Sequence, residues 1–127
     1  MYVGMARPLR HPTRDQLELP LVLDCLSDPI RLAIVYHLSQ HERDGTELRC
    51  GDFNELSGKS NLAYHFAKLR DSGLMQTRIV GTNRLMKLRR EDMDARFPGL
   101  IDAVIKSAAR DAGRLQLLPE CEIADAD

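Results

Sequence analysis

An amphipathic helix that ends at a glycine is the feature that most constrains the fold of this chain. Between residues 59 and 72, the apolar side chains of Leu62, Phe66 and Leu69 recur at the spacing of one helix face. The opposite face is polar, with small side chains near its N-terminus. Gly73 follows, and glycine commonly ends a helix because it adopts the left-handed conformation at little cost. We therefore predict one helix at residues 59–72 with one buried face.

The periodicity changes immediately after this helix. Residues 75–80 alternate between two faces, which is the period of a half-buried strand. The turn residues of Gly81-Thr82-Asn83 come next, and a second strand-like segment follows at residues 84–88. This pattern predicts a β-hairpin with a basic rim.

Four further helices are predicted at residues 14–26, 29–40, 52–56 and 98–112. The one at 29–40 begins where the capping side chains of residues 27–28 precede a proline at the first helical position, and Pro20 is expected to delay or kink the first helix. The fold class is then mainly α (α+β): a winged helix-turn-helix with about five helices and a two-stranded β-hairpin wing. We expect one DNA-binding and dimerisation domain at 15–113, between a flexible arm at 1–14 and an acidic tail at 114–127.

The charge is unevenly distributed along the chain. The net charge is −1 at pH 7, but residues 57–90 hold eight basic residues and a single acid, Asp71, a local net charge of +7. A local basic face attracts a polyanion, while an acidic remainder preserves solubility. Charge alone is equally compatible with a solvated charged surface.

Composition excludes several classes of protein. With 43% hydrophobic and 29% charged residues the chain is typical of a folded globular protein. No apolar run approaches the roughly 18 residues that cross a membrane, and the basic N-terminus lacks the apolar stretch of a secretory signal. We therefore expect a cytoplasmic protein without membrane association. No nucleophile–base pairing, glycine-rich phosphate loop or paired-carboxylate signature occurs, so we expect neither an enzyme nor a cofactor.

The order of these elements is typical of a DNA-binding protein. A short helix, a tight turn and an amphipathic helix lead directly into a basic hairpin; a helix-turn-helix places its second helix in the major groove of double-stranded DNA, with N-terminal side chains at base edges. The hairpin beside it is positioned for phosphate or minor-groove contacts. The DNA-binding candidates are Lys59, Ser60, Asn61, Tyr64, His65, Lys68, Arg78, Thr82, Asn83 and Arg84.

These candidates divide by chemistry. Ser60, Asn61 and Tyr64 are the expected base contacts, since an Asn amide pairs bidentately with adenine; the alternative is that they are ordinary exposed polar residues. Lys59 and Lys68 are expected to bind phosphate, which adds affinity without sequence information. His65 has two open roles, a DNA contact or a hydrogen-bonded support within the protein.

The sequence resembles the ArsR/SmtB family of bacterial winged-helix repressors over about residues 23–104. The resemblance rests on Leu-Ser-Asp-Pro-Ile-Arg-Leu at 26–32, on His-Phe and Lys-Leu-Arg within 65–70, on Ser-Gly-Leu-Met at 72–75 and on the Gly81 wing. It implies a dimeric repressor that a ligand, a metal or an oxidant releases from its operator. Two residues depart from the family pattern: Gly58 stands where a capping Ser is frequent, and Ala63 stands where a Ser would offer a phosphate contact. Glycine in place of serine at this N-cap lowers helix stability by only a few tenths of a kcal/mol.

The resemblance also implies that the first and last helices form a twofold homodimer. Such a dimer presents two recognition helices about one DNA turn (~34 Å) apart, so we expect an imperfectly palindromic operator. The alternative is that the apolar stripe of the last helix covers its own subunit, and both roles are compatible. The candidate interface residues are Leu17, Leu21, Leu100, Ile101, Val104, Ile105 and Ala108.

The effector is the least constrained part of this hypothesis. Metal ligands in the family include a Cys pair before the recognition helix, but here Cys50 has no cysteine within two residues, so we expect no metal site. A redox response requires two cysteines to meet, and Cys25 and Cys121 both flank the expected dimer interface; lone cysteines are more often small buried hydrophobes. A small-molecule effector stays open. The main alternative function is a winged-helix protein-interaction module without DNA binding, and a weaker one is an enzyme accessory subunit.

Overall fold

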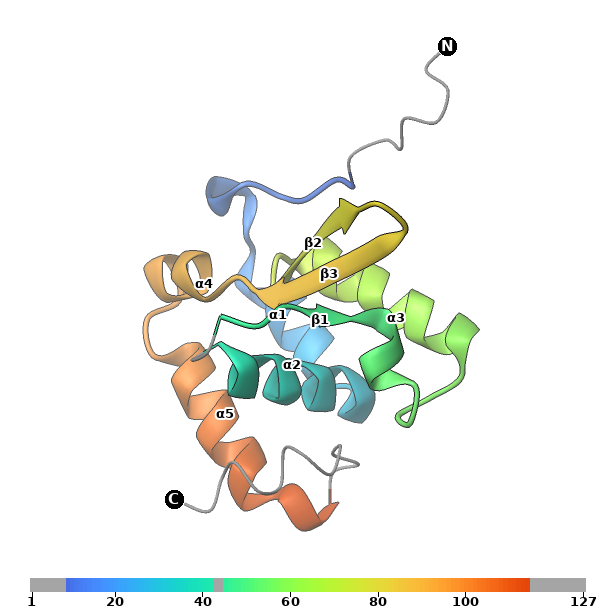
Figure 1. The fold of residues 1–127 in the computed structure, drawn as a ribbon. Helices are drawn as coiled ribbons and strands as arrows, with labels where there is room; N and C mark the ends of the chain where they lie inside the picture. The colour runs from blue at the N-terminus through green and yellow to red at the C-terminus, as the bar shows by residue number, and fades with distance from the viewer. Residues whose placement is uncertain (1–8, 43–44, 115–127) are drawn as a thin grey trace.

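The computed structural model describes residues 9–42 and 45–114 (Figure 1). This part of the chain contains five α-helices and a small antiparallel sheet. The helices are α1 (Leu19–Leu26), α2 (Pro29–His41), α3 (Lys59–Ser72), α4 (Arg90–Arg96) and α5 (Leu100–Arg110). The strands are β1 (Leu48–Arg49), β2 (Met75–Val80) and β3 (Asn83–Leu88), and short 3₁₀ turns lie at Arg14–Gln16, Cys50–Phe53 and Ala112–Arg114. This is the winged helix-turn-helix that the sequence predicts.

The wing is a sheet of three strands in the order β1-β3-β2, where two were predicted. The hairpin itself is confirmed, with Thr77 opposite Met86 and Ile79 opposite Arg84. The added strand β1 pairs Leu48 with Met86 and forms the outer edge. A strand of two residues has no periodicity to detect, which is why the sequence did not predict it.

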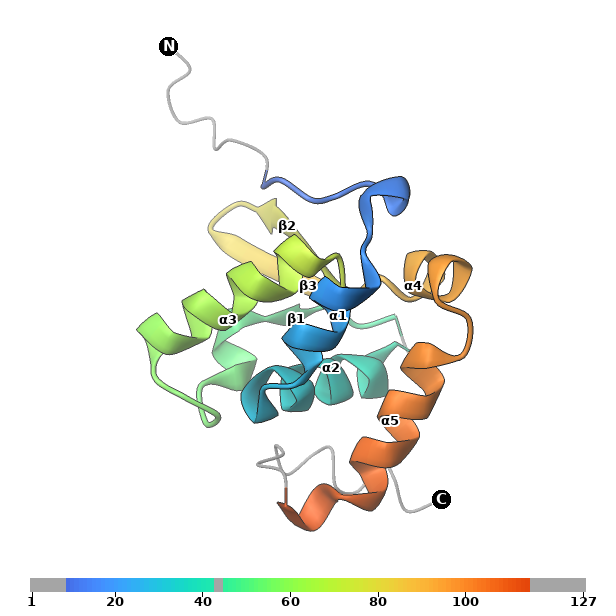
Figure 2. The ribbon, with the colours of Figure 1, turned by 180° about the vertical axis from the view of Figure 1, so that it is seen from behind.

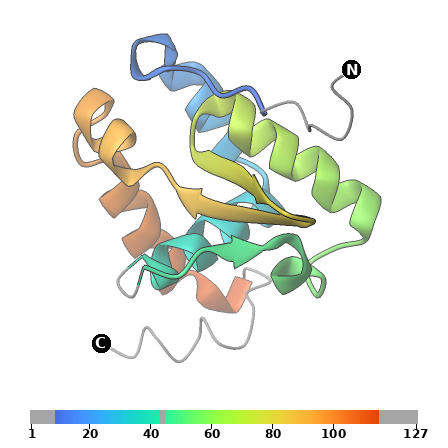
Figure 3. The same ribbon diagram turned by 45° about the horizontal axis from the view of Figure 1, so that its top comes forward.

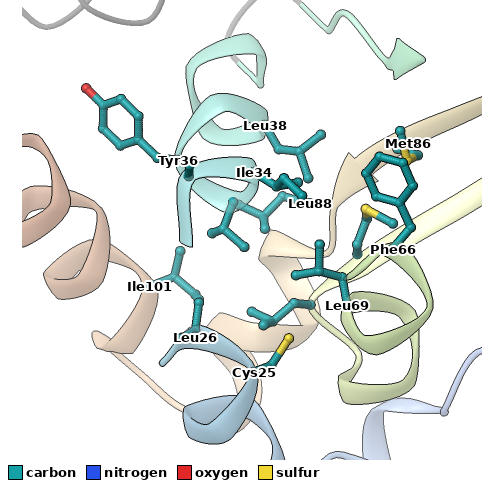
Figure 4. Close-up of a cluster of buried hydrophobic side chains, with 14 of the residues drawn as sticks. Cys25, Leu26, Ile34, Tyr36, Leu38, Phe66, Leu69, Met86, Leu88 and Ile101 are labelled. Carbon is teal, nitrogen blue, oxygen red and sulfur yellow. The ribbon is translucent and has the colours of Figure 1, made fainter. Parts of the chain in front are cut away.

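The core is centred on α2, which is apolar around most of its circumference. Ile34 and Val35 are fully buried there, and the same hydrophobic cluster includes residues from all four other helices and the hairpin. Figure 4 shows Leu69 of α3 and Ile101 of α5 among the side chains of this cluster. A helix that is hydrophobic on all sides is expected in the interior.

Apart from shifts of one or two residues at the ends of α2 and α5, the helices differ from the predictions in three places. The first predicted helix is split: a 3₁₀ turn at Arg14–Gln16 precedes extended backbone, and α1 starts at Leu19 because Pro20 fits the first helical turn but not a helix interior. The third predicted helix is a 3₁₀ turn over Cys50–Phe53. Helix α4 was not predicted, since Met93 is its only buried residue and one apolar residue carries no period.

The described part of the predicted N-terminal arm is packed against the sheet. The imidazole Nε2 of His11 accepts a hydrogen bond from the backbone N–H of Thr77 at 3.0 Å. The guanidinium of Arg89 donates to the carbonyl of Pro12 at 2.7 Å. Residues 9–14 therefore belong structurally to the domain, while residues 1–8 and the predicted tail from 115 onward lie outside the described residues.

Candidate nucleic-acid interface

Helix α3 has the boundaries that the sequence predicts. It begins after Gly58, whose extended backbone forms the N-cap without any side-chain hydrogen bond. It ends at Gly73, which adopts φ +86° and donates its N–H to the carbonyls of Arg70 and Leu69. Only glycine takes this conformation without strain, and the reversal leads the chain directly into β2. The helix and the wing are thus joined by two residues, Gly73 and Leu74, and the first of them has the left-handed conformation.

The exposed face of α3 carries the predicted base-contact candidates. Ser60 and Asn61 are exposed in the first turn, and Tyr64 is 54% exposed one turn later. The Asn61 amide donates to the Ser57 hydroxyl at 2.7 Å, and the Lys68 ammonium lies 5.6 Å from the centre of the Tyr64 ring. A cation above an aromatic ring is attracted to its π face. The face is therefore polar, partly pre-oriented and open to solvent.

His65 lies inside the protein, where the sequence left its role open. Its ring is buried, and its Nδ1 receives a hydrogen bond at 3.1 Å from the Arg31 guanidinium, which can only donate. Arg31 is also buried and donates to the Cys25 carbonyl at 2.8 Å. Burial lowers the pKa of His65, opposed by the nearby Asp28 carboxylate and reinforced by Arg31. The structure therefore places His65 as a support that ties α3 to α1 and α2.

Arg31 is a residue whose role the sequence analysis missed. Its position within the motif at 26–32 is visible in the sequence, but a buried arginine with backbone and histidine partners requires three helices to meet. The Asp28 side chain starts α2 by accepting from the N–H groups of Ile30 and Arg31, as the capping signal predicts.

The two arginines predicted on the wing lie on opposite faces of the hairpin. Arg84 is paired with Ile79, on the face that turns toward α3. Arg78 is paired with Leu85 on the outer face, where its guanidinium forms an ion pair with Glu47 at 2.6 Å. That contact lowers the pKa of Glu47. Arg78 is thus engaged within the protein, whereas Arg84 has no ion pair among the residues that the structure describes.

The hairpin tip carries the remaining wing candidates. Thr82 and Asn83 are exposed there, next to Gly81, which adopts φ +63° in the turn. Lys59 is exposed at the start of α3. The tip of the hairpin and the N-terminal half of α3 lie at the same end of the domain (Figure 3). The structure thus brings a basic wing edge close to the polar start of the recognition helix.

Comparison with known proteins decides the family. No family model matches the sequence. Over 85 residues, 65% of this chain and 82% of the relative, the chain is 33% identical to a protein of Bacillus subtilis (strain 168) named uncharacterized HTH-type transcriptional regulator YceK. The chain belongs to the HTH-type transcriptional regulators.

The predicted dimer residues of this HTH-type regulator separate into two groups. Leu17, Ile101 and Ala108 are buried in the core of the chain itself, so they are not available to a partner in this conformation. Leu21 is 51% exposed. The side chains of Leu100, Val104 and Ile105 are half-buried along α5. The stripe of α5 covers its own subunit, since Ile101 and Ala108 lie in the core and the three half-buried residues pack against it.

The cysteines of the regulator have different surroundings. Cys25 is buried, and burial raises the pKa of its thiol, while Cys50 is half-buried in the turn before α3. Cys121 lies outside the described residues, so the structure does not test its pairing with Cys25. No cluster of three or more His, Cys, Asp or Glu side chains suited to a metal ion occurs within residues 9–42 and 45–114. Over the same residues, no helix is long and apolar enough to cross a membrane.

Proposed function

We propose that this regulator is a sequence-specific repressor that binds double-stranded DNA as a homodimer on a palindromic operator, in the manner of the ArsR/SmtB family that it resembles. The observation that carries the proposal is the exposed polar face at the start of α3, set beside a basic hairpin. A helix-turn-helix uses such a face to reach base edges in the major groove.

The proposed contacts follow from the exposed chemistry. Ser60, Asn61 and Tyr64 read bases, and the Asn61 amide exchanges its Ser57 hydrogen bond for an adenine edge. The phosphate contacts come from exposed side chains on α3 and the hairpin, namely Lys59, Lys68, Thr82, Asn83 and Arg84. Arg78 joins them only if DNA displaces Glu47 from its guanidinium. His65 acts indirectly, by holding α3 against α2 through Arg31.

The first test is selection from a pool of random duplex DNA, repeated at two salt concentrations. We expect an enriched palindrome whose affinity falls steeply as salt rises, because phosphate binding releases counterions. Absence of both enrichment and salt dependence would reject the proposal and favour a protein-interaction module with the same fold.

Two substitutions separate affinity from specificity. Arg84→Ala should weaken binding to operator and scrambled duplexes alike and reduce the salt slope by about one. Asn61→Ala should instead lower the preference for the operator by about 1–3 kcal/mol. Arg110→Ala serves as the matched control, since Arg110 is exposed on α5 away from α3 and the hairpin. An Arg84→Ala effect confined to the operator would contradict the assignment.

The homodimer is supported by the apolar surface of α1. One side of this short helix faces the core through Val22, Cys25 and Leu26. Its other three leucines are exposed to solvent: Leu19, Leu21 and Leu23. Both α1 and α5 pack on α2 (Figure 2), and a groove of about 340 Å³ with mostly apolar lining lies between them. Exposed apolar clusters of this kind mark interaction surfaces.

Sedimentation equilibrium tests the homodimer. Leu21→Glu should shift the protein from dimer to monomer, because it places a charge on the proposed interface. Val80→Glu is the control, since Val80 is an exposed apolar residue of the hairpin. Equal association of both variants and the wild type would reject α1 as the interface.

A further inference from the structure

A groove of about 590 Å³ lies between α3 and the inner face of the hairpin. Residues in and just after the 3₁₀ turn at Cys50–Phe53 also line it. Its volume falls within the range of small-molecule sites, about 300–1,000 Å³. The lining residues are Cys50, Gly51, Asn54, Lys59, Leu62, Ala63, Phe66, Arg70, Thr77, Arg84 and Met86.

Periodicity on both sides of the groove explains its lining. Lys59, Phe66 and Arg70 recur at intervals of seven and four residues, which keeps them on one flank of α3. On the hairpin, Thr77 is paired with Met86, and the next pair on the same face is Ile79 with Arg84. The groove is therefore apolar at its base and cationic at its rim.

Among the described residues, no carboxylate lines the groove beside its cationic rim. Neither Arg70 nor Arg84 forms an ion pair within the described ranges. Burial lowers the pKa of Arg70 and the nearby Arg84 lowers it further, while Asp71 and Cys50 oppose this shift. Two guanidinium groups that repel each other in a partly dry groove favour the entry of an anion.

An unpartnered hydroxyl provides independent evidence of a ligand. Thr77 is only 4% exposed, and its Oγ1 has no hydrogen-bond partner anywhere in the described structure. A buried hydroxyl without a partner is destabilising, and such groups are rare in folded proteins. This one belongs to a residue that lines the groove. A ligand with an oxygen acceptor would satisfy it.

We propose that this groove binds a small organic anion, with a carboxylate held by Arg70, Arg84 and the Thr77 hydroxyl and an apolar body of one or two rings over Leu62, Phe66 and Met86. An arginine fork matches a carboxylate bidentately. The apolar base would give an organic acid an advantage over an inorganic anion of the same charge.

Occupancy of the groove also has a regulatory consequence, which rests on the proposed function. Arg84 and Lys59 line the groove and are proposed phosphate contacts. An anion between α3 and the wing neutralises these cations and competes with DNA for them. The organic anion therefore acts as an effector that lowers DNA affinity.

Calorimetry without DNA tests the binding site, with 2-naphthoate as the probe. We expect 2-naphthoate to bind, and its neutral twin 2-naphthamide and inorganic phosphate to bind at least tenfold more weakly. Bound 2-naphthoate should also slow alkylation of Cys50, measured on the peptide that contains it. The proposal would be overturned if 2-naphthoate did not bind at millimolar concentration. It would also be overturned if inorganic phosphate bound as tightly as 2-naphthoate, which would indicate a binding site for a DNA phosphate.

Three variants locate the ligand. Arg70→Gln and the isosteric Thr77→Val should each weaken 2-naphthoate about tenfold or more, while the exposed Arg110→Gln on α5 should have no effect. Thr77→Val should also raise the midpoint of thermal unfolding, because it removes a buried hydroxyl that has no partner within the described structure. Wild-type affinity in both groove variants would overturn the site.

The regulatory consequence is tested with the selected duplex. We expect 2-naphthoate to weaken DNA binding by the wild type and to have much less effect on Thr77→Val, whose proposed DNA contacts are intact. If 2-naphthoate binds the groove but no duplex is selected, the groove assignment stands and the repressor proposal fails. If a duplex is selected and 2-naphthoate leaves its affinity unchanged, the groove is no effector site.

Discussion

Replacement of Gly73 by alanine should destabilise this regulator more than any other glycine-to-alanine change in the described chain. Gly73 ends the recognition helix at φ +86°, a conformation that residues with a Cβ rarely adopt. A Cβ built there would lie 2.1 Å from Cδ2 of Leu17, far inside contact distance. Leu17 is buried at 1% exposure, so its side chain has little room to move away.

The expected cost has two parts. The left-handed conformation costs an L-residue about 1–2 kcal/mol. The overlap with Leu17 is an overpacking of the core, which costs about 1–3 kcal/mol. Together they give a loss of about 2–5 kcal/mol in the free energy of unfolding, a large fraction of the ~5–15 kcal/mol that stabilises a typical protein.

Urea denaturation with a matched control separates these two parts. Gly99 has almost the same backbone conformation, φ +84°, but no described atom lies within 4 Å of a Cβ built on it. Gly99→Ala should therefore lose only the conformational part, about 1–2 kcal/mol. In the Leu17→Ala background, Gly73→Ala should also fall to this lower cost. Equal losses for Gly73→Ala and Gly99→Ala in the wild-type background would refute the packing argument.

Three further results are expected. Asp28→Ala should lower the free energy of unfolding by about 1 kcal/mol in urea denaturation, because the carboxylate caps two N–H groups of α2; an unchanged midpoint would contradict this. Because burial lowers the pKa of His65, the unfolded chain binds its proton more readily, so stability present above about pH 6.5 should be lost on acidification through the lower folded-state pKa. His65→Asn, whose amide oxygen can accept a hydrogen bond from Arg31, should reduce this loss of stability. Identical dependence of stability on pH in the variant and the wild type would exclude His65 as its cause. Glu47→Gln should tighten non-specific DNA binding about two- to fivefold by freeing Arg78, whereas Glu91→Gln, an exposed acid on α4, should change it less.

Local signals account for the elements that were predicted correctly. Helix α3 and the hairpin have strong periods, and glycine marks the boundary between them. The start of α2 was equally local, since Asp28 and Pro29 act within one turn. The elements that were missed, β1 and α4, are short and depend on neighbours distant in the sequence. Their stability comes from tertiary packing rather than from their own pattern.

The interface was predicted less completely than the fold. Exposed residues such as Asn61 and Tyr64 were identified from the polar face of one helix. The burial of His65 was not decided by that pattern, because its surroundings come from Arg31 on another helix. The engagement of Arg78 by Glu47 likewise required a contact between residues 31 positions apart.

The sequence by itself determined the order of the elements, the ends of the recognition helix and the basic character of the segment that contains it. These properties depend on periodicity and charge, which act between residues close in the chain. Only the tertiary structure decided that Arg70, Arg84 and Thr77 line one groove, and that the Thr77 hydroxyl has no partner among the described residues. That arrangement depends on how α3 packs against the hairpin, and the distances and burial set by packing cannot be read from the period of either segment.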